Sequence, residues 1–490
     1  MRPNKPPYFL SIDIGTSGVR SSLFDSSGNE QEGLRSVRRS PDPEDPSEFD
    51  PETLLQLVIA CLDEVHSGCE ESDITPAFAG VSCFWHGLLG IDAAGTPVTS
   101  LFTWADTRAS DAAESLRARL DEREMHRRTG CHFHSSFWPA KLVQLSEKEP
   151  EVFEKTRKWI SFADLLHSRL TGELATSVSI ASGTGLFDQR RCIWDEGLAL
   201  ECGVSLGVLP AIAADGASGR LIPEFRNRWP LFSETNWLPA IGDGAANNLG
   251  ANCVGIERAA LMIGTSAALR CVFEGDVPES IPEGLFCYRL DRNRIVLGGA
   301  LSDGGSLYRW LTETLGLDVD ETSIEQRYRE RPPGYHGLTF LPFVFGERST
   351  GYHTDAKGSV IGITRGTDAE DIVLAAMEGI AFRLSEILTR MERVTKPKEI
   401  VVSGGAIETS AYLAQLVADV LGRDVLQTET GLASLRGAAL FAIEASGSDA
   451  PASGETELSP VPILHDPARH KAYLAELRKH RRFYERYYRK

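Results

Sequence analysis

The stretch Phe9–Asp25 reads FLSIDIGTSGVRSSLFD, and a second stretch, Ala259–Glu274, reads AALMIGTSAALRCVFE. Both place Ile-Gly-Thr-Ser inside an apolar, strand-like run, at Ile14–Ser17 and at Ile263–Ser266. The offset between the copies is 249 positions, which is close to half of the 490-residue chain. We therefore predict two similar half-molecules, each with a strand, a tight turn and a second strand. The alternative is two unrelated hairpins that share four letters by chance, because short motifs produce false matches.

The repeated turn has the chemistry of a phosphate-binding site. Gly15 and Gly264 let backbone N–H groups approach a ligand closely, and the hydroxyls that follow add donors. Backbone N–H groups gathered in a turn suit phosphate oxygens. The copies differ where Asp13 of the first is Met262 of the second. Two phosphate turns with a carboxylate on only one side predict a nucleotide whose Mg²⁺ is held from the first half.

The composition indicates an ordinary globular protein that is long enough for two large domains. The formal net charge of −18 argues against nucleic acid or an anionic membrane as the main partner. Nine scattered cysteines without a Cys-x-x-Cys pair predict reduced, buried thiols in a cytoplasmic protein. The first residues contain no apolar leader segment, and no run is long enough to span a bilayer. Cys131–His134 has no further ligand cluster near it, so no structural metal is expected there.

Strand-like and helix-like segments alternate along the chain, which predicts a mixed α/β fold. The clearest are helices at Pro51–His66, Asp371–Val394 and Ser410–Leu421, and strands at Phe78–Cys83, Ile295–Leu297 and Glu399–Val402. The Ser-, Gly-, Ala- and Pro-rich segment 445–460 is predicted to be a mobile surface loop. The basic, aromatic end at 469–490 is predicted to be a helix packed on its domain. Nucleic-acid binding by this tail is the alternative, which the acidic remainder opposes.

Two stretches of the first half are candidates for substrate contact. Trp85 and His86 follow a strand, where ligand contacts are common, although a lone histidine is more often structural. Trp104 precedes Asp106 and Arg108, which together offer an apolar wall with a polar network behind it. The alternative for that stretch is an ordinary ion pair at a helix start.

Asp243 is the candidate catalytic carboxylate. It stands between Gly242 and Gly244, where little side-chain bulk blocks a substrate. A carboxylate in such a turn can accept the proton of an attacking hydroxyl. The alternative is an N-cap for a helix predicted over Ala245–Leu249.

The second half contains two predicted strand–glycine–helix junctions. One is Gly298–Gly305, followed by Arg309, and the other is Ser403–Ala406, followed by Thr409. A flat base or a ribose can approach the backbone at such a junction. One Gly-Gly pair is weak evidence, but two of them downstream of a phosphate-type turn favour a nucleotide site.

Taken together, these motifs resemble the FGGY family of carbohydrate kinases over essentially the whole chain. Asp13–Arg20 and Ile263–Ser266 look like its two phosphate motifs. Gly242–Gly244 looks like the segment that holds its catalytic base, and Ser403–Ala406 looks like its adenosine motif. Gly358–Ile363, with Asp371, Ile372 and Ala375–Glu378, fits its C-terminal signature. This signature speaks against another kinase or hydrolase on the same fold.

The resemblance implies two ribonuclease-H-like, actin-like ATPase domains with the active site in the cleft between them. Residues 1–250 would form the domain for sugar, Mg²⁺ and catalytic base, and residues 251–490 the nucleotide domain. The implied reaction is ATP-dependent phosphorylation of a small sugar or sugar acid at a primary hydroxyl. Asp243 would be the base, Asp13 would hold Mg²⁺ through water, and Trp85, His86 and Trp104 would shape the sugar pocket with Asp243. The ATP contacts would be Gly15, Thr16, Ser17, Arg20, Gly264, Thr265, Gly305, Arg309, Gly405 and Thr409.

Within the family, several segments look most like gluconate kinases. They are Thr103–Arg108, Arg128–His134, Phe286–Tyr288, Gly298–Ala300, Asp303–Gly305 and Leu341–Arg348. D-Gluconate is therefore the predicted substrate. A xylulose kinase, or another pentulose or polyol kinase, is the alternative, and a non-enzymatic actin-like ATP-binding protein is a remote one. Trp85 and Ser177 depart from the family pattern on the substrate side, where Met and Asp are common. The sequence leaves open whether the chain acts alone or as a homodimer.

Overall fold

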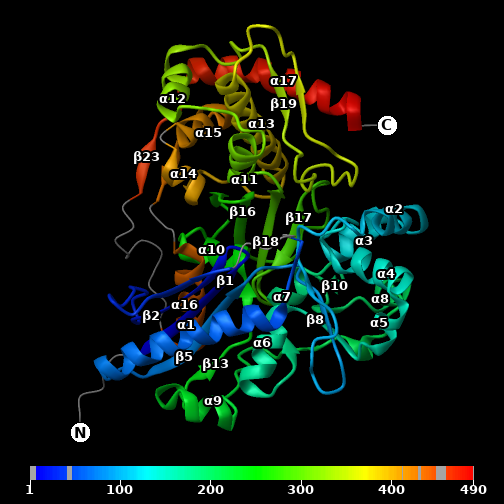
Figure 1. Ribbon diagram of the computed structural model, residues 1–490, viewed down its shortest axis with the longest axis vertical. Coiled ribbons are helices and arrows are strands. Elements are labelled where there is room, and N and C mark those ends of the chain that lie inside the picture. The colour runs from blue at the N-terminus through cyan, green and yellow to red at the C-terminus, as the bar shows by residue number, and fades with distance from the viewer. Residues whose placement is uncertain (1–6, 41–46, 411, 429–431, 449–459, 489–490) are drawn as a thin grey trace.

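Two mixed β-sheets form the centre of the computed structural model, one from each half of the chain (Figure 1). The structure describes residues 7–40, 47–410, 412–428, 432–448 and 460–488. The strands of the first sheet, in spatial order, are β13 (Asn236–Trp237), β5 (Pro76–Cys83), β1 (Tyr8–Gly15), β2 (Gly18–Phe24) and β3 (Ser36–Arg39), with β14 (Ile241–Gly242) also paired to β5. The strands of the second are β17 (Phe286–Arg289), β18 (Arg294–Leu301), β16 (Ala267–Glu274), β15 (Arg258–Ile263), β21 (Glu399–Ser403), β22 (Val425–Gln427) and β23 (Val461–Ile463).

The two sheets repeat one pairing pattern. In the first, β1 runs antiparallel to β2 and parallel to β5. In the second, β15 runs antiparallel to β16 and parallel to β21. Each Ile-Gly-Thr-Ser copy forms the turn of the central hairpin, where Gly15 lies opposite Gly18 and Ile263 lies opposite Ala267. The predicted strand–turn–strand repeat is therefore confirmed, and the reading of two unrelated hairpins is wrong.

Helices cover both sheets, and a separate group of short helices extends the first half sideways. Among the long ones are α1 (Pro51–Ser72) on the first sheet, and α13 (Ala369–Met391) and α17 (Pro467–Tyr488) in the second half. The lateral group, at the right of Figure 1, has its own core around Trp138, Trp159 and Trp194. It comprises α2 (Ser110–Arg119), α3 (Glu122–Thr129), α4 (Trp138–Lys148), α5 (Pro150–Lys155) and α8 (Glu196–Glu201). The remaining helices are α6 (Phe162–Thr171), α7 (Val178–Ser182), α9 (Pro223–Arg228), α10 (Asp243–Gly250), α11 (Gly305–Arg309), α12 (Glu321–Glu330), α14 (Gly405–Thr409), α15 (Leu413–Leu421) and α16 (Ala433–Ala445).

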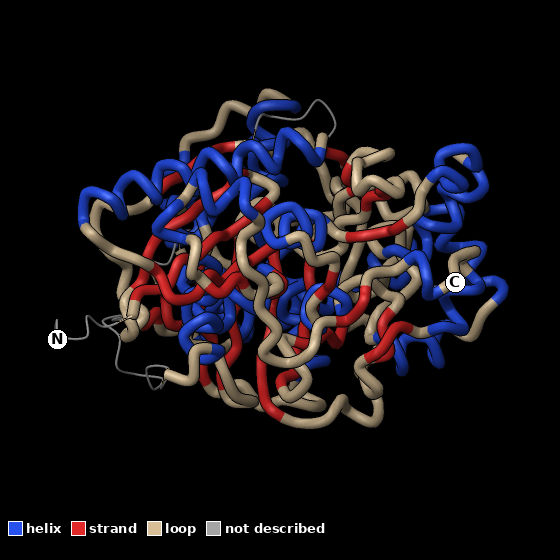
Figure 2. The backbone as a smooth tube through the Cα atoms, turned by 90° about the horizontal axis from the view of Figure 1, so that it is seen from below, coloured by secondary structure: helices blue, strands red, loops and turns tan. Residues whose placement is uncertain are grey.

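Figure 2 shows the strands in the interior of the molecule and helices along its outside. Helix α16 belongs to the C-terminal half of the sequence but packs on the N-terminal sheet (Figure 1). The hydroxyl of Ser11 on β1 donates to the carbonyl of Leu435, 2.5 Å away. Helix α10, which begins at Asp243, packs beside α16. A Cβ on Gly250 would collide with the backbone of α16, and a Cβ on Gly437 would collide with that of α10. Glycine at these positions lets the two backbones approach each other closely.

Some boundaries differ from those predicted from the sequence. Gly298 and Gly299 lie inside β18, which continues to Leu301, so the strand–glycine–helix junction begins only after that residue. A Cβ on Gly298 would stand 2.3 Å from the carbonyl oxygen of Leu269 on the neighbouring strand, so this glycine lets the two strands approach closely and does not make room for a base. The helix predicted over Ser410–Leu421 is present as α15, which begins at Leu413, and the separate short helix α14 precedes it.

The predictions for the C-terminal helix and for the cysteines are confirmed. The C-terminal helix is present as α17, with Tyr473 and Tyr484 buried. All nine cysteines are buried and unpaired. Most of the predicted 445–460 loop lies outside the described residues. Within the described residues, no three His, Cys, Asp or Glu side chains are gathered as a metal site, and none of the helices is both long and apolar enough to pass through a bilayer.

Candidate active site

A cavity of about 580 Å³ lies between the two repeated turns. Ser17 and Arg20 line it from the first half, and the second half supplies the opposite wall. The predicted ATP contacts that line it are Ser17, Arg20, Gly264, Thr265, Gly305, Arg309, Gly405 and Thr409. Gly15 and Thr16 belong to the same β1–β2 turn but are not part of the lining. Tyr308, Met377 and Tyr412, which the sequence did not indicate, add an apolar wall.

The second phosphate turn is held by the loops beside it. The N–H groups of Gly305 and Ser306, at the start of α11, donate to the carbonyls of Gly264 and Thr265 at 2.7 and 3.1 Å. Gly404 has φ 105°, and a Cβ there would stand 2.5 Å from the carbonyl oxygen of Ile263. Nothing lies within 4 Å of a Cβ built on Gly264 or Gly405. These two glycines therefore leave open space over their backbones along the cavity.

Asp13 is buried at the carboxyl end of β1. Its Oδ1 accepts a hydrogen bond from the Ser82 hydroxyl at 2.8 Å, and its Oδ2 accepts one from Nη1 of Arg20 at 3.2 Å. Burial raises the pKa of Asp13, Arg20 and Ser82 oppose that shift, and Asp243 adds to it. The two carboxyl groups are thus close enough to repel each other. Because Arg20 also lines the cavity, it connects this carboxylate pair to the proposed ATP site.

The residues present fit a Mg²⁺ ion that arrives with ATP. Mg²⁺ keeps several waters and is commonly bound through one or two carboxylates together with substrate phosphates. Asp13 and Asp243 are two such carboxylates in a buried setting, and a cation would relieve their mutual repulsion. Asp13 would hold the ion, and the ion would supply neutralisation of phosphate charge.

Asp243 is the first residue of α10 and is not its cap. The N-cap position is Gly242, and no side chain caps the helix. Oδ1 of Asp243 accepts only the N–H of the next residue, Gly244, at 2.8 Å. Burial raises the pKa of Asp243, and the positive charge of Arg270 opposes that shift. The capping role considered from the sequence is therefore wrong, and the carboxylate keeps the capacity to accept a proton.

The glycines around Asp243 have a packing role that differs from the one expected. A Cβ on Gly242 would collide with the indole of Trp85, and one on Gly244 would stand 2.7 Å from the guanidinium of Arg270. The glycines therefore make room for these two side chains, not directly for a substrate. Trp85 itself is buried, and its Nε1 donates to the carbonyl of Ser179 at 2.9 Å.

His86 adopts an uncommon backbone conformation next to Trp85. Its φ is 71°, a region that non-glycine residues enter only when the surroundings hold them there, often at functional sites. Nδ1 lies 2.6 Å from the carbonyl oxygen of Gly183, and the ring packs edge-on against Phe137 and Tyr288. Burial holds the pKa of His86 well below its ordinary value, so the ring is neutral at pH 7. With Nδ1–H donating to the carbonyl, Nε2 is left as an acceptor for a substrate hydroxyl.

Trp104 lies apart from the nucleotide cavity and faces an arginine from the other half of the chain. The guanidinium carbon of Arg348 stands 5.3 Å from its ring centroid. Behind it, Arg108 pairs with Asp106 at 3.0 Å, so the ordinary ion pair considered above is present. The positive charge of Arg348 also acts on His86 and Asp243. We call Trp85, His86 and Trp104, the predicted sugar contacts, the sugar wall. Arg348 therefore acts on residues of the sugar wall and on Asp243 of the carboxylate pair.

Lys141 supports the same wall from behind. It is buried, and its Nζ donates to the carbonyls of His86, Phe102 and Thr103 at 3.1, 3.3 and 2.5 Å. It therefore joins the backbone of His86 to the segment that carries Trp104. Sequence reasoning did not single out Lys141, Arg270 or Arg348. Lys141 and Arg270 could have been found from the sequence, because each is a charged residue inside an otherwise apolar helix or strand.

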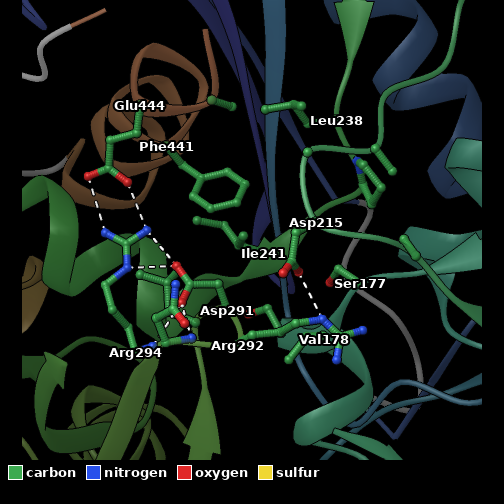
Figure 3. A pocket seen from close by; sticks show the side chains of 18 of the residues that line it. Ser177, Val178, Asp215, Leu238, Ile241, Asp291, Arg292, Arg294, Phe441 and Glu444 are labelled. Atoms are coloured by element: carbon green, nitrogen blue, oxygen red, sulfur yellow. Dashed lines mark hydrogen bonds and ion pairs between the residues drawn. The ribbon is translucent and has the colours of Figure 1, made fainter. Parts of the chain in front are cut away.

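A second cavity, of about 290 Å³, lies behind the sugar wall (Figure 3). Leu238, Ile241 and Phe441 form its apolar side, and Asp215 pairs with Arg292 at 2.9 Å across it. Ser177 faces this cavity. Its hydroxyl accepts from the N–H of Ile180 as the cap of α7 and donates to the carbonyl of Ala240 at 2.5 Å. Ser177, which stands where the family commonly has Asp, therefore holds the start of α7. Trp85 donates to the carbonyl of Ser179, two residues further along the same helix.

The structure contains two copies of one sheet arrangement, and a phosphate-type turn from each copy lies on either side of a cavity. This is the architecture of an actin-like phosphotransferase. The comparisons make the class specific. The model of the FGGY family of carbohydrate kinases, N-terminal domain, matches residues 8–250, and the model of its C-terminal domain matches residues 259–446. The chain belongs to the FGGY family of carbohydrate kinases. It is a sugar kinase that uses ATP as phosphate donor, so the non-enzymatic alternative is set aside.

Known relatives include kinases of two kinds of substrate. A gluconokinase of Bacillus licheniformis is 28% identical over 458 residues, which cover 90% of this chain and 88% of the relative. A xylulose kinase of Escherichia coli (strain K12) is 27% identical over 494 residues, covering 97% and 98%. The crystal structure of a gluconate kinase from Lactobacillus acidophilus aligns with a TM-score of 0.86 at 25% identity and covers 98% of both chains. This likeness confirms the predicted actin-like fold.

Proposed function

We propose that this chain transfers the γ-phosphoryl group of Mg²⁺·ATP to the 6-hydroxyl of D-gluconate and forms 6-phosphogluconate. The observation that carries the proposal is a series of neighbouring groups. Arg20 lines the nucleotide cavity and donates to Asp13, Asp13 is close enough to Asp243 for their charges to interact, and the glycines on either side of Asp243 pack against Trp85. A phosphate donor on one side and a hydroxyl acceptor on the other would meet at Asp243. Phosphoryl transfer depends mainly on positioning and on charge neutralisation.

In this proposal Asp243 accepts the proton of the 6-hydroxyl while the oxygen of that hydroxyl bonds to the γ-phosphorus. The bond from phosphorus to the bridging oxygen breaks, and ADP leaves with that oxygen. The backbones of Gly15, Gly264 and their Thr-Ser neighbours would hold the phosphates. Gly305, Arg309, Gly405 and Thr409 would line the nucleoside site. Trp85 and Trp104 would bound the sugar, and Nε2 of His86 would accept from one of its hydroxyls.

The gluconokinase relatives and the gluconate-kinase-like segments of the sequence support gluconate as the substrate. A xylulose kinase is the second candidate. Two observations favour it. The His86-Gly87 pair resembles the pattern of xylulose kinases, and the E. coli xylulose kinase aligns over 97% of this chain and 98% of its own length. The nine reduced cysteines support a cytoplasmic location.

A substrate panel tests the proposal. D-Gluconate, D-xylulose, D-ribulose and glycerol would be compared by ADP release at fixed Mg²⁺·ATP. We expect D-gluconate to have the highest kcat/KM. A ketose that exceeds gluconate by about tenfold or more would refute the proposed substrate, because a hydrophobic or hydrogen-bonding change at a sugar site produces differences of that size.

A further inference from the structure

Two arginines of the second half reach the sugar wall of the first. Arg270 lies on β16, and Arg348 follows β19 (Thr339–Leu341) in a loop. Each is only 8% exposed. Neither lines the nucleotide cavity, whose arginines are Arg20 and Arg309. Both buried guanidinium groups therefore lie outside the nucleotide cavity.

Arg270 has unused hydrogen-bonding capacity. Its Nε and Nη1 are buried and have no hydrogen-bond partner within the described part of the chain. The guanidinium lies against Gly244, next to the carboxylate pair, but forms no ion pair with any described residue. A buried guanidinium with unpartnered N–H groups is costly. A ligand that accepts from those groups would remove the cost.

Arg348 is also without a carboxylate partner among the described residues. Its guanidinium lies over the Trp104 ring. The neighbouring residue Glu347 is turned away, since its carboxylate pairs with Arg383 and accepts from Tyr484 at 2.7 Å. The two guanidinium groups share one nearby carboxylate, Asp243. The carboxyl group of Asp13, which also acts on Asp243, pairs with Arg20 at 3.2 Å, so Arg270 and Arg348 have no ion-pair partner among the described residues.

We propose that Arg270 and Arg348 bind the carboxylate of a sugar-acid substrate and set the preference of the enzyme for aldonates over uncharged sugars. The proposal rests on the proposed function, and it assigns its specificity to two residues. Arginine suits this role because its N–H groups match the oxygens of a carboxylate. The γ-phosphate of ATP is the other source of anionic oxygens in this enzyme. Arg270 lies against Gly244 beside Asp243, Arg348 lies over Trp104, and neither lines the nucleotide cavity, which favours the carboxylate.

The test compares D-gluconate with D-gluconamide, which keeps the hydroxyls and replaces the carboxylate by a neutral amide. For Arg270→Gln and Arg348→Gln, we expect kcat/KM for gluconate to fall by roughly 10- to 100-fold, because a charge-assisted hydrogen bond is lost. Because both arginines oppose the raised pKa of Asp243, some loss with gluconamide is expected as well. The readout is therefore the ratio of kcat/KM for gluconate to kcat/KM for gluconamide, which should fall by about tenfold or more, while KM for ATP should change by less than about threefold. Gluconate binding without nucleotide, measured by calorimetry, should weaken in parallel. Arg270→Lys and Arg348→Lys, which keep the charge, should restore part of the preference.

Arg289 provides the matched control. It is buried on β17, in the same sheet as Arg270, but its Nε and Nη1 donate to the carbonyls of Gln189 and Arg292 at 2.6 and 2.5 Å. Arg289→Gln should lower the melting temperature and leave the ratio of gluconate to gluconamide unchanged. Arg270→Gln removes a buried charge that has no hydrogen-bond partner for Nε and Nη1, but it also removes a positive charge that acts on Asp243, so its melting temperature is measured alongside its kinetics. If it does not fold, Arg348→Gln carries the test.

The outcomes separate the two proposals. If the wild type does not use gluconate, the proposed substrate is wrong and the assignment of the arginines is wrong with it. If the wild type uses gluconate but the folded variants lose gluconate and gluconamide equally, only the assignment is overturned. A rise in KM for ATP with an unchanged acid-to-amide ratio would also overturn it, and would make the γ-phosphate the ligand of these arginines.

Discussion

Asp243→Asn is the substitution that tests the proposed reaction most directly. The amide keeps the shape of the side chain, and its oxygen can still accept the N–H of Gly244, the one hydrogen bond that Oδ1 makes in the structure. It cannot take the proton of a hydroxyl. Loss of a general base costs roughly 10²–10⁴ in rate, which corresponds to about 3–5 kcal/mol in the activation barrier.

The stability of the same variant should change little. Replacing the carboxylate removes the burial penalty that raises the pKa of Asp243, which is stabilising. It also removes the nearest negative charge from Arg270, which is destabilising. Since Gly242 is the N-cap of α10, no helix cap is lost. We expect the two effects to leave the free energy of unfolding within about 1 kcal/mol of the wild-type value.

Three measurements on one preparation decide the matter: kcat from ADP release, ATP affinity from calorimetry, and melting temperature. Asp164→Asn is the matched control. Burial raises the pKa of Asp164 to about 6, but its carboxylate belongs to the capping box of α6, so wild-type kcat is expected for this control.

The pH profile of the wild type tests the same base. As the pH falls, kcat/KM should begin to drop at a pH above the ordinary aspartate pKa of 3.8, because Asp243 is protonated as the pH falls through its raised pKa. A folded Asp243→Asn variant with turnover within a few-fold of the wild type would refute the argument.

Two further substitutions test the walls of the site. Thr265→Val, which removes a hydroxyl from the second phosphate turn, should weaken ATP binding or turnover by roughly 10- to 100-fold, and normal ATP kinetics in the folded variant would count against that turn as a phosphate contact. Lys141→Met should raise KM for the sugar and leave KM for ATP unchanged, because Lys141 joins the His86 and Thr103 backbones. Burial lowers the pKa of Lys141 from 10.5 to about 7, so the unfolded state binds more protons between these values and the stability of the wild type relative to Lys141→Met should rise as the pH increases through that window. A pH-independent difference would contradict the buried, titrating lysine.

The fold and the nucleotide side could be predicted because their signals are local. Consecutive residues encode a strand, a glycine turn and a second strand. The repeat could therefore be recognised from Ile14–Ser17 and Ile263–Ser266 without any tertiary information. The glycines of the cavity lining follow strands in the same way. Gly298 shows the limit of such a prediction, because a larger residue there would collide with the backbone of the neighbouring strand at the carbonyl of Leu269.

The acceptor side could not be predicted fully because its contacts join distant parts of the chain. Arg348 and Trp104 meet across the two halves, and neither position alone indicates the other. Lys141 reads as one charged residue in an amphipathic helix, and only the three carbonyls around it show why it is buried. Such pairings depend on how the elements pack, which a local pattern does not encode.

The path of α16 means that the molecule cannot be divided where the sequence repeats. A fragment that ends at residue 250 would leave Phe9 and Leu238 without the side chains of Leu440 and Ile443 that cover them. The complementary fragment would carry that apolar helix with no sheet beneath it. The two similar halves are therefore joined by one helix that the second half contributes to the core of the first. Truncated versions for expression, or chimaeras that join halves of two relatives, would have to take α16 together with the N-terminal sheet.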